Sequence, residues 1–422
     1  MKLLFILIIS LILTALPAQE QVHDLQDWDF DTIFDESFDE ILNEEDVNVT
    51  EGKQVTQLVN RRGVNFSASY DFNAGIAPSW HEIPWSSDRQ TSEYYLDRFL
   101  RMRTSFTLDA QISSVFRVIN TVYFQIPEFK FSLGDFFFDY NFFNTVYARG
   151  GKYNHAWGIS PNYSFTNLLS RVPKDKSAGE SFILKFDVPI GIGGIQVLAM
   201  TRADLMGSSD LPKLEDFGFG GKYNLALRRV DYDMGFFYQK GMPLRSFLSI
   251  KTTIKKTELY SEYLLAVDLD EPYISGAFNI GFMQDFFDGK LNLNGELFYN
   301  AEKDSYWYHP ETNIREEGVS PFIEGLNIAL NLSFKPWEKW NPRLFLRALF
   351  APMENSVQLI PGFRINPWQH IELYMAAPVS LGSKNGYYYK NTFTKDKQDR
   401  ALPFALIFLV SLRGSAQFGY YY

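Results

Sequence analysis

From about residue 63 to its last residue, the chain consists of short segments in which apolar and polar side chains alternate. In the first segment, Val64 and Phe66 would face one side of a strand while Asn65 and Ser67 face the other. About eighteen such segments follow one another, each close to the ten residues that a tilted strand needs to cross a bilayer. The pattern predicts an all-β protein, a transmembrane antiparallel up-and-down β-barrel with lipid outside and water inside. Sixteen strands is the alternative count.

The links between these segments alternate between long and short. We expect strands at 63–73, 98–112, 115–126, 127–138, 144–153, 180–190, 195–203, 216–228, 231–241, 245–255, 256–267, 272–284, 289–300, 321–335, 342–352, 355–366, 370–379 and 402–413. The long links 74–97, 154–179, 204–215 and 301–320 all follow odd-numbered strands, and 380–401 precedes the last strand. Membrane barrels have long loops outside and short turns in the periplasm. The alternation therefore places both termini in the periplasm.

Charged residues fix which face of each strand is the inner one. Arg101 and Arg103 stand one pleat apart, and a cation facing hydrocarbon near the midplane would cost about 2–4 kcal/mol. Their side chains must therefore point into the lumen or lie at its rim, which makes this face the inner one. The same parity predicts a mixed-charge pore lining of Arg101, Arg103, Asp109, Arg117, Arg149, Lys152, Lys251, Glu258, Glu262, Glu296 and Arg347. Opposed rows of such charges can set a transverse field that selects polar solutes, or they can simply pair across strands. The basic residues favour anionic or carbohydrate solutes.

The N-terminal part of the chain differs from the rest. Residues 1–18 carry one basic residue, an apolar run and a small-residue site, and they read as a signal peptide. Residues 1–46 hold twelve of the 50 acidic residues and one of the 40 basic ones, so the remainder is nearly neutral. We expect an acidic periplasmic segment at 19–60 and the barrel at 61–422. The acidic segment is a flexible leader, a hatch in the barrel mouth or a partner-binding peptide.

A glycine-rich motif follows the fifth expected strand. It contains Gly151 and Lys152, then Trp157 and Gly158, then a Pro161-Asn162 turn. This spacing resembles the outer-membrane porins of the alginate-export type over about thirty residues, and the barrel layout extends the likeness to the mature chain. The resemblance implies a passive channel of about eighteen strands whose inward-folded loops narrow the pore. Read without it, Trp157 would be an interface aromatic and Gly158 a kink.

The chain shows no pattern typical of an enzyme. It has 0 Cys and 5 His, and none of the histidines stands at strand spacing with a plausible Ser or Asp partner. Gly191 to Gly194 is a hairpin turn with no helix after it, so it is not a phosphate-binding loop. We therefore expect no catalysis, no cofactor, no metal and no nucleic-acid partner.

These patterns together favour a porin-like channel in the outer membrane of a diderm bacterium, for passive diffusion of small hydrophilic solutes. The alternatives are a fatty-acid-transporter type of channel for hydrophobic substrates, gated by the N-terminal segment, and a surface adhesin or structural barrel. The expected partners are outer-membrane lipid, the barrel-assembly machinery, a small polar solute and, as an open question, further copies of the chain. Tyr422 resembles the C-terminal aromatic signal that the assembly machinery reads.

Overall fold

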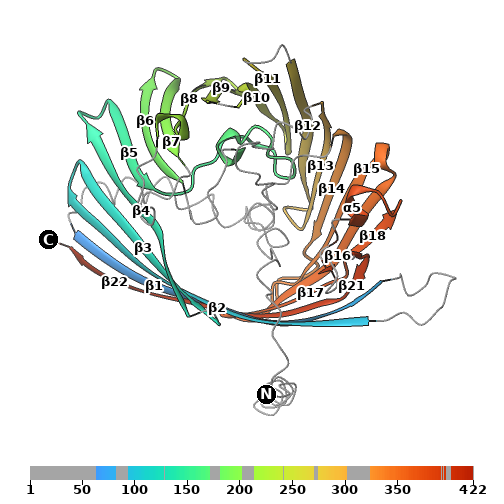
Figure 1. The fold of residues 1–422 in the computed structure, drawn as a ribbon. Helices are drawn as coiled ribbons and strands as arrows, with labels where there is room; N and C mark the ends of the chain where they lie inside the picture. Colours follow the sequence, from blue (N-terminus) through green and yellow to red (C-terminus); the bar gives the residue numbers. More distant parts are fainter. Residues whose placement is uncertain are drawn as a thin grey trace.

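The fold is a closed antiparallel β-barrel of eighteen strands with almost no helix (Figure 1). The computed structural model describes residues 63–81, 94–127, 129–171, 181–201, 213–240, 242–269, 274–301, 324–390, 392, 394–395 and 401–421. The expected signal peptide 1–18, the acidic segment 19–60 and Tyr422 lie outside the described residues. Among the described helices, none is long and apolar enough to cross a membrane.

Each strand pairs with its sequence neighbours, and the first strand pairs with the last. The strands are β1 (Gly63–Trp80), β2 (Tyr94–Ser113), β3 (Phe116–Ile126), β4 (Lys130–Phe142), β5 (Val146–Lys152), β6 (Phe182–Ile190), β7 (Gly193–Thr201), β8 (Gly218–Leu227), β9 (Val230–Gln239), β10 (Leu244–Ile254), β11 (Thr257–Val267), β12 (Ile274–Phe286), β13 (Leu291–Asn300), β14 (Gly325–Phe334), β15 (Arg343–Ala351), β16 (Ser356–Trp368), β17 (Ile371–Ala376), β18 (Val379–Gly382), β21 (Phe404–Ala405) and β22 (Ile407–Tyr421). The short elements outside the wall are η2 (Leu168–Arg171), η3 (Leu214–Asp216), η5 (Pro352–Glu354), α5 (Tyr387–Lys390), β19 (Thr394–Lys395) and β20 (Ala401–Leu402).

Two positions in the wall are each filled by two strand segments. β17 and β18 both pair with β16, on either side of Ala377-Pro378, and β21 and β22 both pair with β1. Counting each such pair as one strand gives the eighteen strands expected from the sequence, and every expected strand corresponds to one of them. The long links gather at one end of the barrel. Both ends of the described wall, Gly63 and Tyr421, lie paired at the end with the short turns.

The last strand is displaced from its expected position. The sequence predicted 402–413, but β22 runs to Tyr421 and its residues from Phe408 onward pair with β1. Glycine weakens an isolated strand, yet here β1 supplies a complete ladder on one side. At Gly414 a Cβ atom would lie 2.6 Å from the ring of Tyr70, so the glycine makes room for an aromatic side chain on the neighbouring strand.

The two faces of the wall carry different side chains. Leu100, Phe106 and Leu108 of β2 point outward and are 40–51% exposed, as expected of a surface in contact with lipid. The inner face is polar near the short turns but not throughout. Two clusters of buried apolar side chains also lie inside the barrel, and the larger one forms where the chain between β5 and β6 folds inward. The sequence alone predicted a uniformly polar inner face, so this apolar part is a correction.

Candidate functional site

The candidate site is built around the inward segment, which we define as residues 153–171, immediately after β5. Figure 1 shows this stretch crossing the space inside the ring of strands. The turn inward begins at Gly151, whose φ of +141° is rarely adopted by other residues. A Cβ atom there would lie 2.2 Å from the Phe136 carbonyl oxygen. Glycine at this position therefore lets the chain leave the wall without a clash with β4.

Apolar side chains seat the inward segment against the wall. Tyr163 and Phe165 pack on Phe298 of β13, with ring centroids 4.8 and 4.9 Å apart. Leu168 of η2 is fully buried in the same cluster, and Trp157 lies 5.7 Å from the Phe247 ring of β10. Buried aromatic side chains contribute large apolar areas to such contacts. The segment is thus an integral part of the barrel interior.

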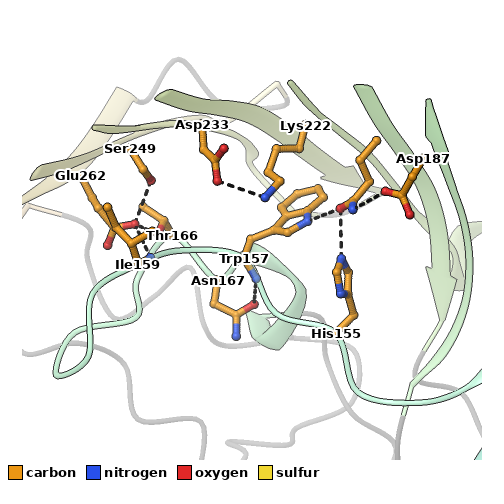
Figure 2. A network of polar contacts seen from close by, with 11 residues as sticks. His155, Trp157, Ile159, Thr166, Asn167, Asp187, Lys222, Asp233, Ser249 and Glu262 are labelled. Carbon is orange, nitrogen blue, oxygen red and sulfur yellow. Dashed lines mark hydrogen bonds and ion pairs between the residues drawn. The ribbon is translucent and has the colours of Figure 1, made fainter. Parts of the chain in front are cut away.

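Trp157 and His155 bind the same wall side chain, Gln196 of β7 (Figure 2). The Trp157 indole Nε1 donates to Gln196 Oε1 at 2.6 Å, and His155 Nε2 lies 3.0 Å from that oxygen. Because the oxygen only accepts, His155 Nε2 carries the hydrogen of this bond. The Gln196 amide in turn donates to Asp187 Oδ1 at 2.8 Å. Burial lowers the pKa of His155, so the ring is neutral at pH 7.

The second anchor of the inward segment is Glu262 of β11. Its Oε1 accepts from the Ile159 amide at 3.0 Å, from Thr166 Oγ1 at 2.6 Å and from Ser249 Oγ of β10 at 2.8 Å. Gly158 makes this approach possible, because a Cβ atom there would lie 2.5 Å from Thr166 Oγ1. Its φ of +98° also disfavours any other residue.

The third anchor is Glu296 of β13, which receives the Ser160-Pro161-Asn162 turn. Its Oε1 accepts from the Asn162 amide at 3.1 Å and from Asn162 Nδ2 at 2.9 Å. Its Oε2 accepts from Ser160 Oγ at 2.8 Å. Asn162 also receives a bond of 2.7 Å from Asn331 of β14. The turn is therefore hydrogen-bonded to two neighbouring strands of the wall, β13 and β14.

These contacts change the picture of the predicted pore lining. The sequence placed Glu262 and Glu296 among the side chains that face water in the lumen. Both do point inward, but they are 0% and 3% exposed because the inward segment covers them. The correction follows from docking of a distant loop, which strand parity does not report.

Most of the other predicted lining residues pair with a neighbour on the adjacent strand. Register puts them on the inner face; three of the pairs lie at the short-turn hairpins β2–β3, β4–β5 and β10–β11, and the fourth joins β22 to β1. The ion pairs are Arg117–Asp109 at 2.7 Å, Arg149–Asp139 at 2.6 Å, Lys251–Glu258 at 2.7 Å and Arg413–Asp71 at 3.3 Å. Opposite charges are therefore adjacent in these pairs. These contacts correspond to the alternative reading, in which the charges pair across strands.

Lys152 is the residue that the parity argument misplaced. Register pairs it with Phe136, which is 41% exposed on the outer wall, so Lys152 stands on the face opposite to Arg149. Its ammonium donates to the backbone carbonyl of Leu133 at the end of the barrel that carries the long links. Lys152 is three positions after Arg149, so strict alternation would already have placed the two on opposite faces. Gly150 and Gly151 between them have no side chains that would show which face is which.

The inner faces of β15, β16, β22 and β2 are rich in arginine. Strand register aims these side chains inward: Arg101, Arg103, Arg343, Arg347, Arg364 and Arg413. Arg103 stacks on Tyr123, with its guanidinium carbon 3.7 Å from the ring centroid. Within the described part of the chain, neither Arg103 nor Arg347 has a carboxylate within ion-pair distance.

Sequence reasoning missed several residues of the site. Gln196, Ser249, Asn279 and Asn294 are buried on the inner face and bind the inward segment or its anchors. Each occupies an inward position of an alternating strand, so parity could have identified them as inward. Nothing local distinguishes them from the many other polar residues of the lumen.

The barrel is similar to solved structures of outer-membrane porins. Pseudomonas aeruginosa OpdL matches with a TM-score of 0.52 at 9% identity, over 84% of this chain and 99% of that one. OccK5 (OpdH) of the same organism matches at 0.51 and 8%, over 83% and 98%. Acinetobacter baumannii OccAB4 matches at 0.51 and 8%, over 85% and 100%. At these identities the likeness establishes the fold alone.

No protein-family model matches the chain, and no curated protein matches it in sequence. The resemblance to alginate-export-type porins is therefore unsupported by these comparisons and stays a prediction. One feature that it implied, a loop folded into the barrel, is present as the inward segment.

Proposed function

We propose that this protein is an outer-membrane channel through which small hydrophilic anions diffuse passively. Its closed eighteen-stranded barrel has the porin fold and an outer wall of exposed apolar side chains. The asymmetry of its links supports an orientation with the short turns and both barrel ends in the periplasm. Assembly by the barrel-assembly machinery and association into oligomers remain predictions.

The arginine-rich wall carries the proposal for anions. The inward segment buries Glu262 and Glu296, so two carboxyl groups that point inward are withdrawn from the lumen. Arg103 of β2 and Arg347 of β15 keep their charge without a described carboxylate partner. Arg347 stands at the edge of the inward segment, since it is in register with Asn331, which binds Asn162. The side chains that a passing solute meets there are thus more cationic than the sequence suggests.

The chemistry of arginine suits carboxylate or phosphate solutes. The guanidinium stays charged at all accessible pH values and presents several donors in one plane, which match two oxygens of an oxyanion. A series of such groups can hold an anion loosely at several successive sites, which is what conduction requires. The exposed side chains of the inward segment are small and uncharged: Asn154, Ala156 and Ser164.

Conductance in planar bilayers tests the proposal. We expect stable steps in the single-channel current and, under a salt gradient, a reversal potential whose sign indicates anion selectivity. Arg347→Gln should shift that potential towards cations, whereas Arg347→Lys, which keeps the charge, should leave its sign unchanged. Cation preference of the natural protein would contradict the solute class. Silence from correctly folded protein would contradict the channel itself and favour an adhesin or structural barrel.

A further inference from the structure

Glu262 and Glu296 are both buried, but their oxygen atoms are used very differently. Glu296 accepts on both oxygens: Oε1 from Asn162 and from the Tyr260 hydroxyl at 2.8 Å, and Oε2 from Ser160 and from Asn279 Nδ2 at 3.1 Å. Each of these groups is a donor toward the carboxyl group. An arrangement of this kind stabilises an ionised carboxylate even where water is excluded.

Glu262 is satisfied on one oxygen only. All three of its donors, from Ile159, Thr166 and Ser249, converge on Oε1. Its Oε2 is buried and has no hydrogen-bond partner among the described residues, and the residue as a whole is 0% exposed. A carboxylate oxygen that carries charge and lacks any donor is costly in such a place.

Asn279 of β12 presents a second acceptor without a donor, directly beside Glu262. The two residues are opposite each other in register and both face inward. The Asn279 amide nitrogen donates to Ser160 Oγ at 2.8 Å and to Glu296 Oε2. Because an ionised Glu296 can only accept, the nitrogen must face it, so the orientation of the amide is fixed. Asn279 Oδ1 is thereby left buried, and no donor in the described part of the chain reaches it.

We infer that Glu262 carries a proton on Oε2 and donates it to Asn279 Oδ1, while Glu296 is ionised. One hydrogen then satisfies both oxygens that lack a donor. Asn279 connects the two carboxyl groups, accepting from the neutral one and donating to the charged one. The inward segment is docked on a pair that holds a single negative charge, and Glu262 and Asn279 act as positioning residues for it.

Among the described residues, the cations nearest to Glu262 are already paired with other carboxylates: Lys251 of β10 with Glu258, and Lys222 of β8 with Asp233, which is in register with Ser249. The other titratable groups that face Glu262 are Glu296 across β12 and Tyr260 on its own strand. The inward segment and β12 contribute only the Ile159, Thr166 and Asn279 groups. Ionising Glu262 would place two negative charges side by side in a buried site.

The shared proton makes docking of the inward segment depend on pH. The docked state holds a proton that a solvated glutamate releases at neutral pH. The docked state therefore binds more protons than the undocked state, and docking weakens as pH rises. This dependence concerns the inward segment itself and does not require that the barrel conduct.

Two isosteric substitutions distinguish the two carboxyl groups. Glu262→Gln keeps an accepting oxygen and puts an N–H where the proton is inferred, so it should dock the segment as the natural protein does and remove the alkaline weakening. In Glu296→Gln, one of the two accepting oxygens becomes an amide nitrogen, which faces groups that are themselves donors. The inward segment should then dock less firmly, and hydrogen exchange at the Asn162 amide should accelerate. A larger loss of protection in Glu262→Gln than in Glu296→Gln would overturn the inference.

Infrared spectroscopy detects the protonated carboxyl group directly in the natural protein, so this test does not depend on whether Glu296→Gln folds. With carbon-13-labelled glutamate at neutral pH, we expect the carbonyl band of a protonated carboxyl group, shifted in heavy water and lost in Glu262→Gln. Absence of that band would show that Glu262 is ionised. A melting temperature lowered by a chelator in the natural protein, but not in Glu262→Gln, would show instead that a bound cation joins the two oxygens.

Discussion

Replacement of Gly158 by alanine tests whether the inward segment is held by its fit against Glu262. The new methyl group would lie 2.5 Å from Thr166 Oγ1 and 3.4 Å from Glu262 Oε1. Thr166 must then move, and its hydrogen bond of 2.6 Å to Glu262 is lost. The backbone at this position, with φ of +98°, is also unfavourable for alanine.

The expected cost is the sum of two effects. A residue with a Cβ in a left-handed conformation costs about 1–2 kcal/mol. Loss of a buried hydrogen bond that leaves one partner unsatisfied costs about 1–3 kcal/mol. Docking should therefore weaken by about 2–5 kcal/mol, which corresponds to about 30-fold to several thousand-fold in the opening equilibrium.

Gly191→Ala is the matched control. Gly191 lies in the turn between β6 and β7 with φ of +58°, and a Cβ atom there would meet nothing within 4 Å. This variant has the backbone cost and the same effect on the unfolded chain, but not the steric clash. We expect it to leave exchange in the inward segment unchanged.

Amide hydrogen exchange measures the effect directly, because the Ile159 amide donates to Glu262 and the Tyr163 amide donates to Ser160 Oγ at 3.1 Å. Both amides should exchange faster in Gly158→Ala by the factor given above, while amides of the barrel strands keep their protection. Equal exchange in Gly158→Ala and Gly191→Ala would refute the reasoning, since the clash would then contribute nothing.

Three further predictions concern the same segment and the N-terminal part of the chain. Trp157→Phe keeps the ring packing but loses the 2.6 Å bond to Gln196, so docking should weaken by about 1–2 kcal/mol in the same exchange assay; unaltered exchange would contradict this role. Burial lowers the pKa of His155, so the undocked state binds a proton first and docking should weaken as pH falls below about 6.5; a His155→Gln variant with the same acid dependence would contradict it. Deleting 19–60 should leave conductance and solute range unchanged in a passive pore, whereas a rise in conductance or loss of apolar uptake would favour the gated channel for hydrophobic substrates.

For much of the candidate site, the sequence predicted which face of the wall a residue lies on. It did not predict what surrounds the side chain there. Parity put Arg103, Arg117 and Glu262 on the inner face, and the register agrees for all three. It could not tell that Arg117 is neutralised by Asp109, that Arg103 stacks on an aromatic ring, or that Glu262 is covered. Those outcomes depend on neighbours across strands and on a loop from far along the chain.

The sequence by itself determined the barrel. A side-chain period of two, repeated over segments of nearly constant length with long and short links in alternation, specifies the number of strands and the inner face, because both are local properties of an extended chain. Only the tertiary structure decided which inward residues remain in the lumen. Ser160 and Glu296 are 136 positions apart, and their contact depends on the shape and hydrogen bonding of a folded interior that no local period encodes. That contact covers the carboxyl group of Glu296.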